Sequence, residues 1–256
     1  MKAVPKVRLK DKRRRASYAV LAVYGLLTVA VIGAVAYASR LPQFTIQTVH
    51  VSGAQHVSEE SVRTVVDEKL DGSYGLLIPK RLSYVVPAGT LTAAVLDAFP
   101  VVQSVLVTRL SVTELAVEVT ERVPYALWCN AVCYRMDEYG FIFDTAVATD
   151  MHIQFRGGEH VVGDTFMSGV FHDFSRFVAL VSTIARDDVT EVHVSGTDAF
   201  LRLASGGEIR LLTDADFTQT STMLRALFAS SEFQAGKKLD YVELRFGKNA
   251  AVRFKD

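Results

Sequence analysis

The sequence predicts an α+β protein with an N-terminal transmembrane helix, a small β-α-α-β-β unit, and a mainly antiparallel β-sheet domain with packed helices. Three observations support this prediction. Residues 16–39 are uncharged and apolar, and residues 44–120 alternate between strand-like and helix-like apolar periods. Residues 121–256 contain many short period-2 segments separated by glycine turns. A chain of 256 residues, half of them hydrophobic, is long enough to bury one or two cores.

The zero net charge of the chain hides a strong asymmetry around the apolar stretch. Residues 1–15 hold eight Lys or Arg and one Asp, so the remainder carries a net charge of −7. As a helix, residues 16–39 would be about 36 Å long, enough to cross a hydrocarbon core of about 30 Å. Because the basic run lies on one side only, we expect a cytoplasmic tail at 1–15 and the bulk of the chain on the periplasmic or extracellular side.

Other interpretations of the N-terminus fit less well. Ala36-Tyr37-Ala38 resembles a signal-peptide cleavage site, but the apolar region of a signal peptide is usually about 7–15 residues long. A buried soluble helix would need a polar face, which this stretch lacks. A nucleic-acid-binding tail would also be basic, but the adjoining helix already explains "KDKRRR". We therefore expect the lipid bilayer as a partner through residues 16–39, and no nucleic acid.

The next segment, residues 44–120, predicts two helices packed on one face of a three-stranded sheet. The strand "FTIQTVHVSG" comes first, and Ser58 is a suitable N-cap for a helix with an apolar stripe that ends at Leu70. A second helix spans about 91–99, and "VVQSVLVTRL" and "TELAVEVTER" follow it as strands.

The last segment, residues 121–256, predicts a strand-rich domain. The expected elements are strands in "PYALWC", "CYRMD" and "GFIFD", a helix over 166–184, a strand in "VTEVHVSG", a hairpin turned at 205–207, a further helix, and a terminal hairpin in "LDYVELRFGKNAAVRFKD". This order predicts an antiparallel sheet with helices on one face.

Few residues in the chain carry recognisable chemistry. Cys129 and Cys133 flank a short turn, which leaves a small structural disulfide and two free thiols both open. The pair lacks the second pair of ligands that a zinc site needs. The histidines are scattered, and neither a nucleophile motif nor a phosphate-binding glycine loop is present. We expect no enzymatic activity, cofactor or small-molecule substrate.

The segment "FPVVQSVLVTRLSVTELAVEVTERVPYALW" resembles the bacterial cell-division family FtsQ/DivIB, and the order β-α-α-β-β after one membrane span resembles a POTRA module. The matching positions are Pro100, Val102, Val105, Val107, Arg109, Leu115, Val117, Glu121, Arg122, Pro124, Ala126 and Trp128. "YRMDEYGFIFD" and "YVELRFGKNAAVRF" resemble later family segments in the expected order. The family's proline after the first of these and its glycine before the last long helix are absent here.

This resemblance implies a division-septum scaffold at the inner membrane that binds FtsB/DivIC-like and FtsL-like partners. The implied mechanism is addition of a partner strand to an open sheet edge. The expected partner-binding residues all lie in the terminal hairpin: Tyr241, Glu243, Arg245, Phe246, Val252 and Phe254. Alternating apolar residues also fill cores, so both interpretations remain open for Phe246. The alternatives are a POTRA-containing envelope transport or assembly accessory and an anchored enzyme.

Overall fold

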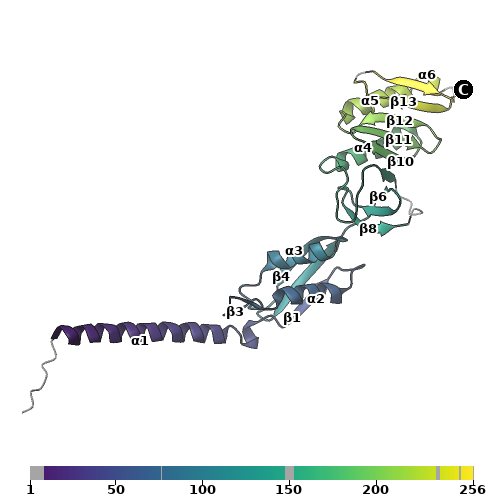
Figure 1. Cartoon of the computed structure of the whole chain (residues 1–256). Helices are drawn as coiled ribbons and strands as arrows, with labels where there is room; N and C mark the ends of the chain where they lie inside the picture. The colour runs from purple at the N-terminus through teal and green to yellow at the C-terminus, as the bar shows by residue number, and fades with distance from the viewer. Residues whose placement is uncertain (1–8, 76, 148–152, 235–236, 248, 256) are drawn as a thin grey trace, which may run out of the picture. The chain divides into compact units, whose positions relative to one another are not determined.

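The computed structural model describes residues 9–75, 77–147, 153–234, 237–247 and 249–255 (Figure 1). The chain forms two compact units. The first comprises residues up to Phe99 together with Ser104–Thr120, and the second comprises Pro100–Gln103 and Glu121–Asp256. Part of the expected cytoplasmic tail, residues 1–8, lies outside the described residues.

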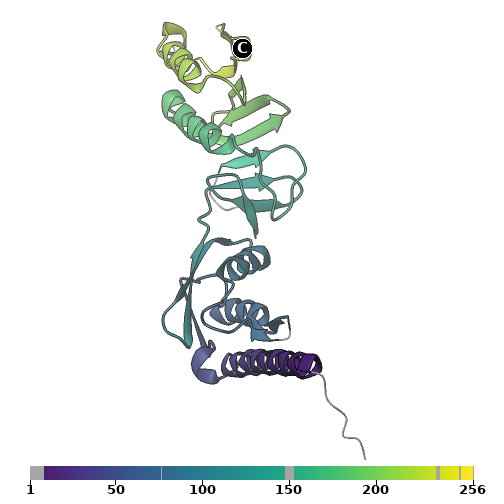
Figure 2. The same ribbon diagram turned by 90° about the vertical axis from the view of Figure 1, so that its left-hand side faces the viewer.

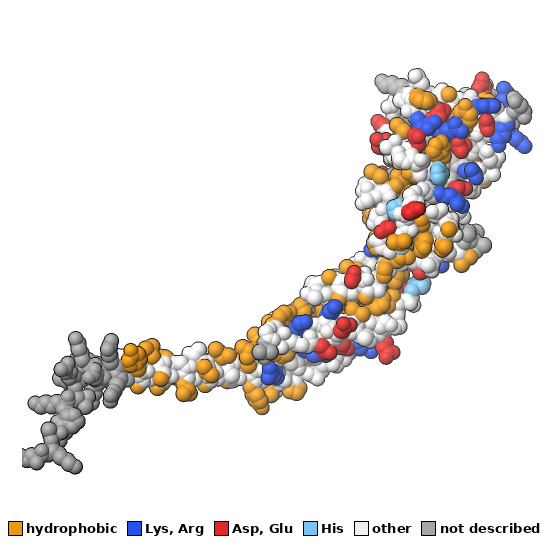
Figure 3. Space-filling model, viewed as in Figure 1, with side chains coloured by type: hydrophobic (Ala, Val, Ile, Leu, Met, Phe, Trp, Pro, Cys, Tyr) orange, Lys and Arg blue, Asp and Glu red, His pale blue; other side chains and the backbone are white. Residues whose placement is uncertain are grey.

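The first element is the long helix α1, Leu9–Ala38. Its apolar part, Ser17–Ala38, has 22 residues and a mean hydropathy of 2.4, and so is long and apolar enough to cross a membrane. Hydrophobic side chains lie along the visible face of this part, interspersed with white backbone and other atoms (Figure 3). A short 3₁₀ turn, Pro42–Phe44, follows the helix.

The rest of the first unit is a three-stranded sheet with two helices on one face (Figure 2). The sheet order is β1-β5-β4, with β1 parallel to β5. The elements are β1 Thr48–Ser52, α2 Glu59–Leu70, the two-residue strands β2 Ser73–Tyr74 and β3 Ile78–Pro79, α3 Ala88–Ala98, β4 Val102–Arg109 and β5 Glu114–Glu121. The predicted order β-α-α-β-β is confirmed, with a small β2–β3 hairpin added between the helices.

Local sequence signals explain how α2 begins and packs. The Ser58 hydroxyl accepts a hydrogen bond from the Ser61 N–H, as expected of an N-cap. Val62, Val66 and Leu70, at successive i+4 positions, are fully buried against the sheet layer. Strand β1 begins later than predicted because residues 44–46 bond to residues 81–83 before β1 joins the sheet.

The second unit is one nine-stranded sheet in the order β14-β13-β12-β11-β10-β9-β6-β7-β8. Its strands are β6 Ala126–Cys129, β7 Cys133–Met136, β8 Ile142–Ala146, β9 Gln154–Arg156, β10 Val189–Ser195, β11 Asp198–Leu203, β12 Glu208–Leu212, β13 Leu239–Glu243 and β14 Ala251–Phe254. Its helices are α4 Phe171–Ala185, α5 Phe217–Phe228 and α6 Ser231–Gln234. The sheet is mainly antiparallel, as predicted, but β9 pairs in parallel with both β6 and β10, and β12 in parallel with β13.

The core of this unit lies between one face of the sheet and helices α4 and α5, which lie on the same side of it (Figure 2). Ile209, Leu211 and Val242 point into this core and are fully buried, whereas Glu208, Arg210 and Tyr241 alternate with them on the opposite face. In β12 and β13, one face is therefore apolar and helix-covered, and the other carries Glu208, Arg210 and Tyr241.

One helix boundary predicted for this unit was wrong, and one strand was missed. The helix predicted from Phe166 begins at Phe171. Phe166 instead lies in a turn, where its N–H donates to the Gly140 carbonyl, and Met167 and Gly169 adopt positive φ angles of 49° and 80°. Strand β9 was not predicted.

Candidate functional site at the C-terminal sheet edge

The terminal hairpin forms one edge of the nine-stranded sheet. Strand β13 pairs in parallel with β12, and β14 pairs antiparallel with β13 as the last strand (Figure 1). Val252 lies opposite the buried Val242 and packs against the core. One face of the hairpin therefore completes the core, and its outer strand, β14, forms the edge of the sheet.

The register determines which backbone groups of β14 point outward. The Lys255 N–H donates to the Lys238 carbonyl at 2.9 Å, so Lys255 faces the preceding strand. Backbone groups alternate between the two sides of a strand, so those of Phe254 and Val252 point away from β13. These two residues offer N–H and C=O groups to an added strand.

The opposite edge of the sheet is partly covered. The Ile142 N–H at the start of β8 donates to the Asp164 carbonyl at 2.9 Å, and the Ile142 carbonyl accepts from the Gly163 N–H at 2.8 Å. Phe141 forms a further bridge with Thr165. The loop around residues 163–165 therefore occupies part of this edge, which leaves β14 as the more open one.

Glu243 and Arg245 form a clamp at the point where β13 ends. Arg245 Nε and Nη2 donate to the two Glu243 carboxylate oxygens, each at 2.8 Å, and the Arg245 backbone N–H donates to Oε1 at 3.2 Å. Arg245 Nη1 also lies 3.1 Å from Asp198 Oδ2 on β11. The side-chain hydrogen bonds from Arg245 hold the pKa of Glu243 below its ordinary value despite burial, and the same pairing raises the pKa of Arg245.

Tyr241 and Phe254 are held by neighbouring side chains. The Arg210 guanidinium lies 4.2 Å from the Tyr241 ring centroid, and Arg210 Nε pairs with Glu208 at 2.6 Å. The Phe254 ring packs against Phe233 of α6 with centroids 5.1 Å apart. These two aromatic side chains are therefore fixed on opposite sides of the hairpin.

Phe246 differs from the other predicted residues because its side chain is 68% exposed. The alternation predicted to continue through Phe246 ends with Leu244, which is buried and whose N–H still donates to the Arg210 backbone carbonyl on β12. The chain then leaves the sheet directly after the clamp. Phe246 thus contributes little to the core in this structure.

A cationic groove lies beside this edge. It is lined by the ends of α4 and α5, by α6 and by the start of β13, and its basic side chains are Arg186, Arg225, Lys237 and Lys238. Phe228 and Phe233 are among its apolar lining residues, and Asp187 is the acidic one. A groove of this composition favours acidic ligands with an apolar face.

A comparison with known protein families identifies the domain that follows α1. Residues 44–122 match the family model for the POTRA domain, FtsQ-type. These residues include β1 through β5, with both helices on one sheet face.

Residues 44–122 form an FtsQ-type POTRA domain.

This domain and the apolar helix before it support an FtsQ/DivIB-like single-pass membrane protein. No curated protein matches the sequence. The FtsQ-type family consists of non-enzymatic scaffolds, and within the described residues no cluster of His, Cys, Asp and Glu could hold a metal ion.

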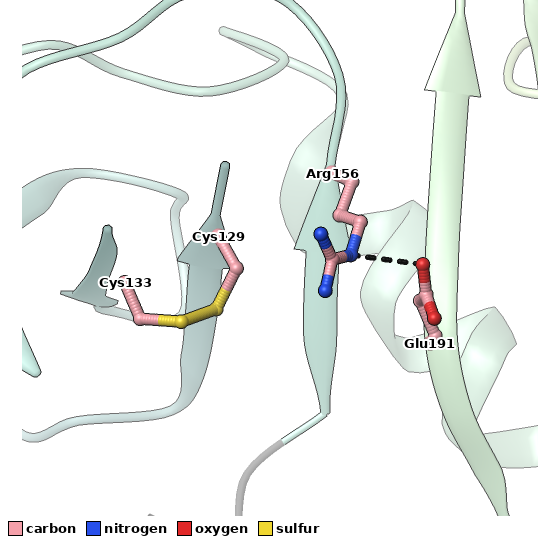
Figure 4. Close-up of a disulfide and its surroundings, with 4 residues drawn as sticks. All are labelled: Cys129, Cys133, Arg156 and Glu191. Carbon is pink, nitrogen blue, oxygen red and sulfur yellow. Dashed lines mark ion pairs between the residues drawn. A yellow bond between two sulfur atoms is a disulfide. The ribbon is translucent and has the colours of Figure 1, made fainter. Parts of the chain in front are cut away.

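In this FtsQ/DivIB-like chain, the cysteines lie at the opposite part of the sheet from the terminal hairpin. Cys129 ends β6, Cys133 begins β7, and a disulfide joins them across the turn (Figure 4). The figure also shows Arg156 of β9 and Glu191 of β10 paired at 2.8 Å on neighbouring strands. The disulfide cross-links the β6–β7 hairpin and lies outside the C-terminal edge.

The structure adds residues that the sequence prediction missed. Asp198 and Arg210 complete the interactions of Arg245 and Tyr241, yet they lie on β11 and β12, far from the terminal hairpin in sequence. The available signal was the strand alternation itself, since polar residues on paired strands face the same side. To use this signal, one would also need to know which residues of β11, β12 and β13 lie opposite one another.

Proposed function

We propose that this FtsQ/DivIB-like chain is a division-septum scaffold that binds FtsB/DivIC-like and FtsL-like proteins by strand addition at β14. An FtsQ-type POTRA domain indicates a protein-interaction role in cell division. The open edge at Val252 and Phe254, beside an exposed Phe246, supports the choice of partner site.

The arrangement suggests how the partner is recognised. A partner strand would pair with the outward backbone groups of β14, which supplies affinity and register but little side-chain specificity. Specificity would come from Phe246 as an exposed aromatic anchor and from the cationic groove, which favours an acidic partner segment. In this proposal Glu243 and Arg245 hold the chain so that Phe246 projects.

The proposal also covers membrane topology and domain roles. The basic residues of 1–15 support a cytoplasmic location for this tail, with the bulk of the chain on the other side of the membrane, at the septum. Residues 16–39 anchor the protein, residues 44–120 form the POTRA domain, and residues 121–256 form an FtsQ-type β-domain that carries the partner site.

Substitution of Phe246 by Ala tests the proposal. The full chain is co-purified with its FtsB-like partner from membranes, as wild type, Phe246→Ala, and a deletion of residues 247–256. We expect both changes to remove the partner, and Phe246→Ala to leave thermal unfolding unchanged because the side chain is exposed. Undiminished co-purification of a folded deletion variant would contradict docking at this edge, and a fluorescent fusion spread evenly along the envelope would contradict the septal role.

A further inference from the structure

The POTRA domain has two ends, and its topology assigns each loop to one of them. Strand β1 starts at the end where the chain arrives from α1. Because β1 and β5 are parallel, with Thr48 opposite Glu114, the β4–β5 turn lies at this same end. The N–H groups of Gln47 and Thr48 both donate to the Thr113 carbonyl in that turn. Residues 110–113 are therefore adjacent to the segment that leaves the membrane helix.

The loop between α2 and α3 lies at the same end. The Ile46 N–H donates to the Arg81 carbonyl at 2.8 Å, and the Ser83 N–H donates to the Phe44 carbonyl at 3.0 Å. Arg81 also pairs with Asp67 and Asp71 at the end of α2. We call residues 73–75, 77–87 and 110–113 the membrane-proximal loops.

The connection between α1 and this end is short and hydrogen-bonded. Successive turns link Ser39 to Val35, Leu41 to Ala38, and Thr45 to Pro42. At about 2 Å per residue for such tight turns, the seven steps along the chain from Ala38 to Thr45 span about 14 Å. Even fully extended they would span about 24 Å. The membrane-proximal loops are thus held near the surface that α1 leaves.

These loops carry most of the exposed large hydrophobic side chains of the domain, the exception among the described residues being Leu106 in β4. The exposed large hydrophobic residues there are Tyr74, Leu77, Ile78, Tyr84, Val85, Leu110 and Val112. Among the described residues, the loops at the other end, 53–58 and 99–101, contribute none, whereas Val123 and Tyr125 are exposed where the chain leaves the domain after β5. Tyrosine is a side chain that lipid interfaces favour, and the Arg109 guanidinium lies 5.1 Å from the Tyr84 ring centroid, where it can meet lipid phosphate.

We propose that the membrane-proximal loops insert into the headgroup region of the bilayer that α1 crosses. The occupant of this apolar surface is lipid, because the short tether holds the loops at the membrane and exposed aromatic and aliphatic side chains bind there by burial. The protein then contacts the bilayer both through α1 and through these loops of the POTRA domain. The second contact fixes the orientation of the POTRA domain relative to the bilayer.

Two leucines on one strand and its turn provide a matched test. Leu110 lies in the β4–β5 turn and is 59% exposed, whereas Leu106 lies within β4 and is 57% exposed. Four residues of strand separate them by about 13 Å. Leu110→Trp and Leu106→Trp make the same change at similar exposure, so folding should be unaffected in both. The native Trp128 is buried in the other unit and gives a constant background.

The full chain of each variant is reconstituted in phosphatidylethanolamine/phosphatidylglycerol vesicles, with and without lipids brominated near the headgroup. We expect bromine to quench the added fluorescence of Leu110→Trp, and of Tyr84→Trp as a second site, but not that of Leu106→Trp. Equal quenching of all three variants, or none above the Trp128 background, would overturn the proposal. So would shielding of Leu110→Trp from an aqueous quencher only after a partner protein is added.

Discussion

Proline at Val252 tests strand addition with little damage to the fold. The Val252 N–H points away from β13, so Val252→Pro removes no β13–β14 hydrogen bond, and edge strands tolerate proline. The side chain is half-buried opposite Val242, so the loss of packing should lower the free energy of unfolding by about 1 kcal/mol. In the complex, the substitution leaves a partner carbonyl without its donor, which costs about 1–3 kcal/mol. The partner Kd should therefore rise about 5- to 150-fold.

Val252→Ala is the matched control because it loses a similar side chain but keeps the backbone donor. We expect its partner Kd to stay within about threefold of wild type, since the side chain faces the core. The assay is biolayer interferometry of the full chain in detergent against the FtsB-like partner, with thermal unfolding of each variant measured in parallel. If Val252→Pro and Val252→Ala bind alike while both remain folded, the partner does not pair with the β14 backbone.

Two further predictions concern stability. Because Arg245 holds the pKa of Glu243 below 4.5, the stabilisation from this pair is present above that pH and is lost as pH falls through the lowered value. Glu243→Gln should therefore reduce the free energy of unfolding by about 1–2 kcal/mol at pH 7 and by progressively less in acid, as measured by urea denaturation; a difference independent of pH would contradict the clamp. Reduction of the Cys129–Cys133 bond, which closes a short loop with a sequence separation of 4, should reduce the free energy of unfolding by about 2 kcal/mol, whereas a double serine variant should not respond to reductant.

Elements with strong local signals were predictable from the sequence. Ser58 caps α2 as its position before an apolar stripe indicates, and the uncharged stretch from Ser17 matches the apolar part of α1. The terminal hairpin was also predictable, because its alternation surrounds a Gly/Asn turn. In each case the determinants lie within a few residues of one another.

The elements that the sequence did not reveal depend on distant contacts. Strand β9 has three residues and gains its hydrogen bonds from β6 and β10, which lie far away along the chain. Phe166 fits the apolar period of the following helix, but it packs against Phe155 and Phe171 from a turn that Gly169 permits. Helical periodicity alone cannot distinguish these two placements.

In the candidate site too, features set by nearby residues were predictable, and features set by distant strands were not. Alternation correctly puts Tyr241 and Glu243 on one face, but it cannot reveal that Arg245 reaches Asp198 on β11. The exposure of Phe246 follows from the end of β13 at Glu243, which the sequence pattern does not mark. Both features depend on the register between strands far apart in sequence.

Residue-resolved hydrogen exchange of the full chain, alone and with its FtsB-like partner, tests the central claim most directly. In the free chain, the outward amides of Val252 and Phe254 should exchange fast and those of Arg253 and Lys255 more slowly. Binding should slow Val252 and Phe254 strongly and change Arg253 little. Protection that appears at β8 or in the POTRA domain, with β14 unchanged, would contradict partner docking at the C-terminal edge.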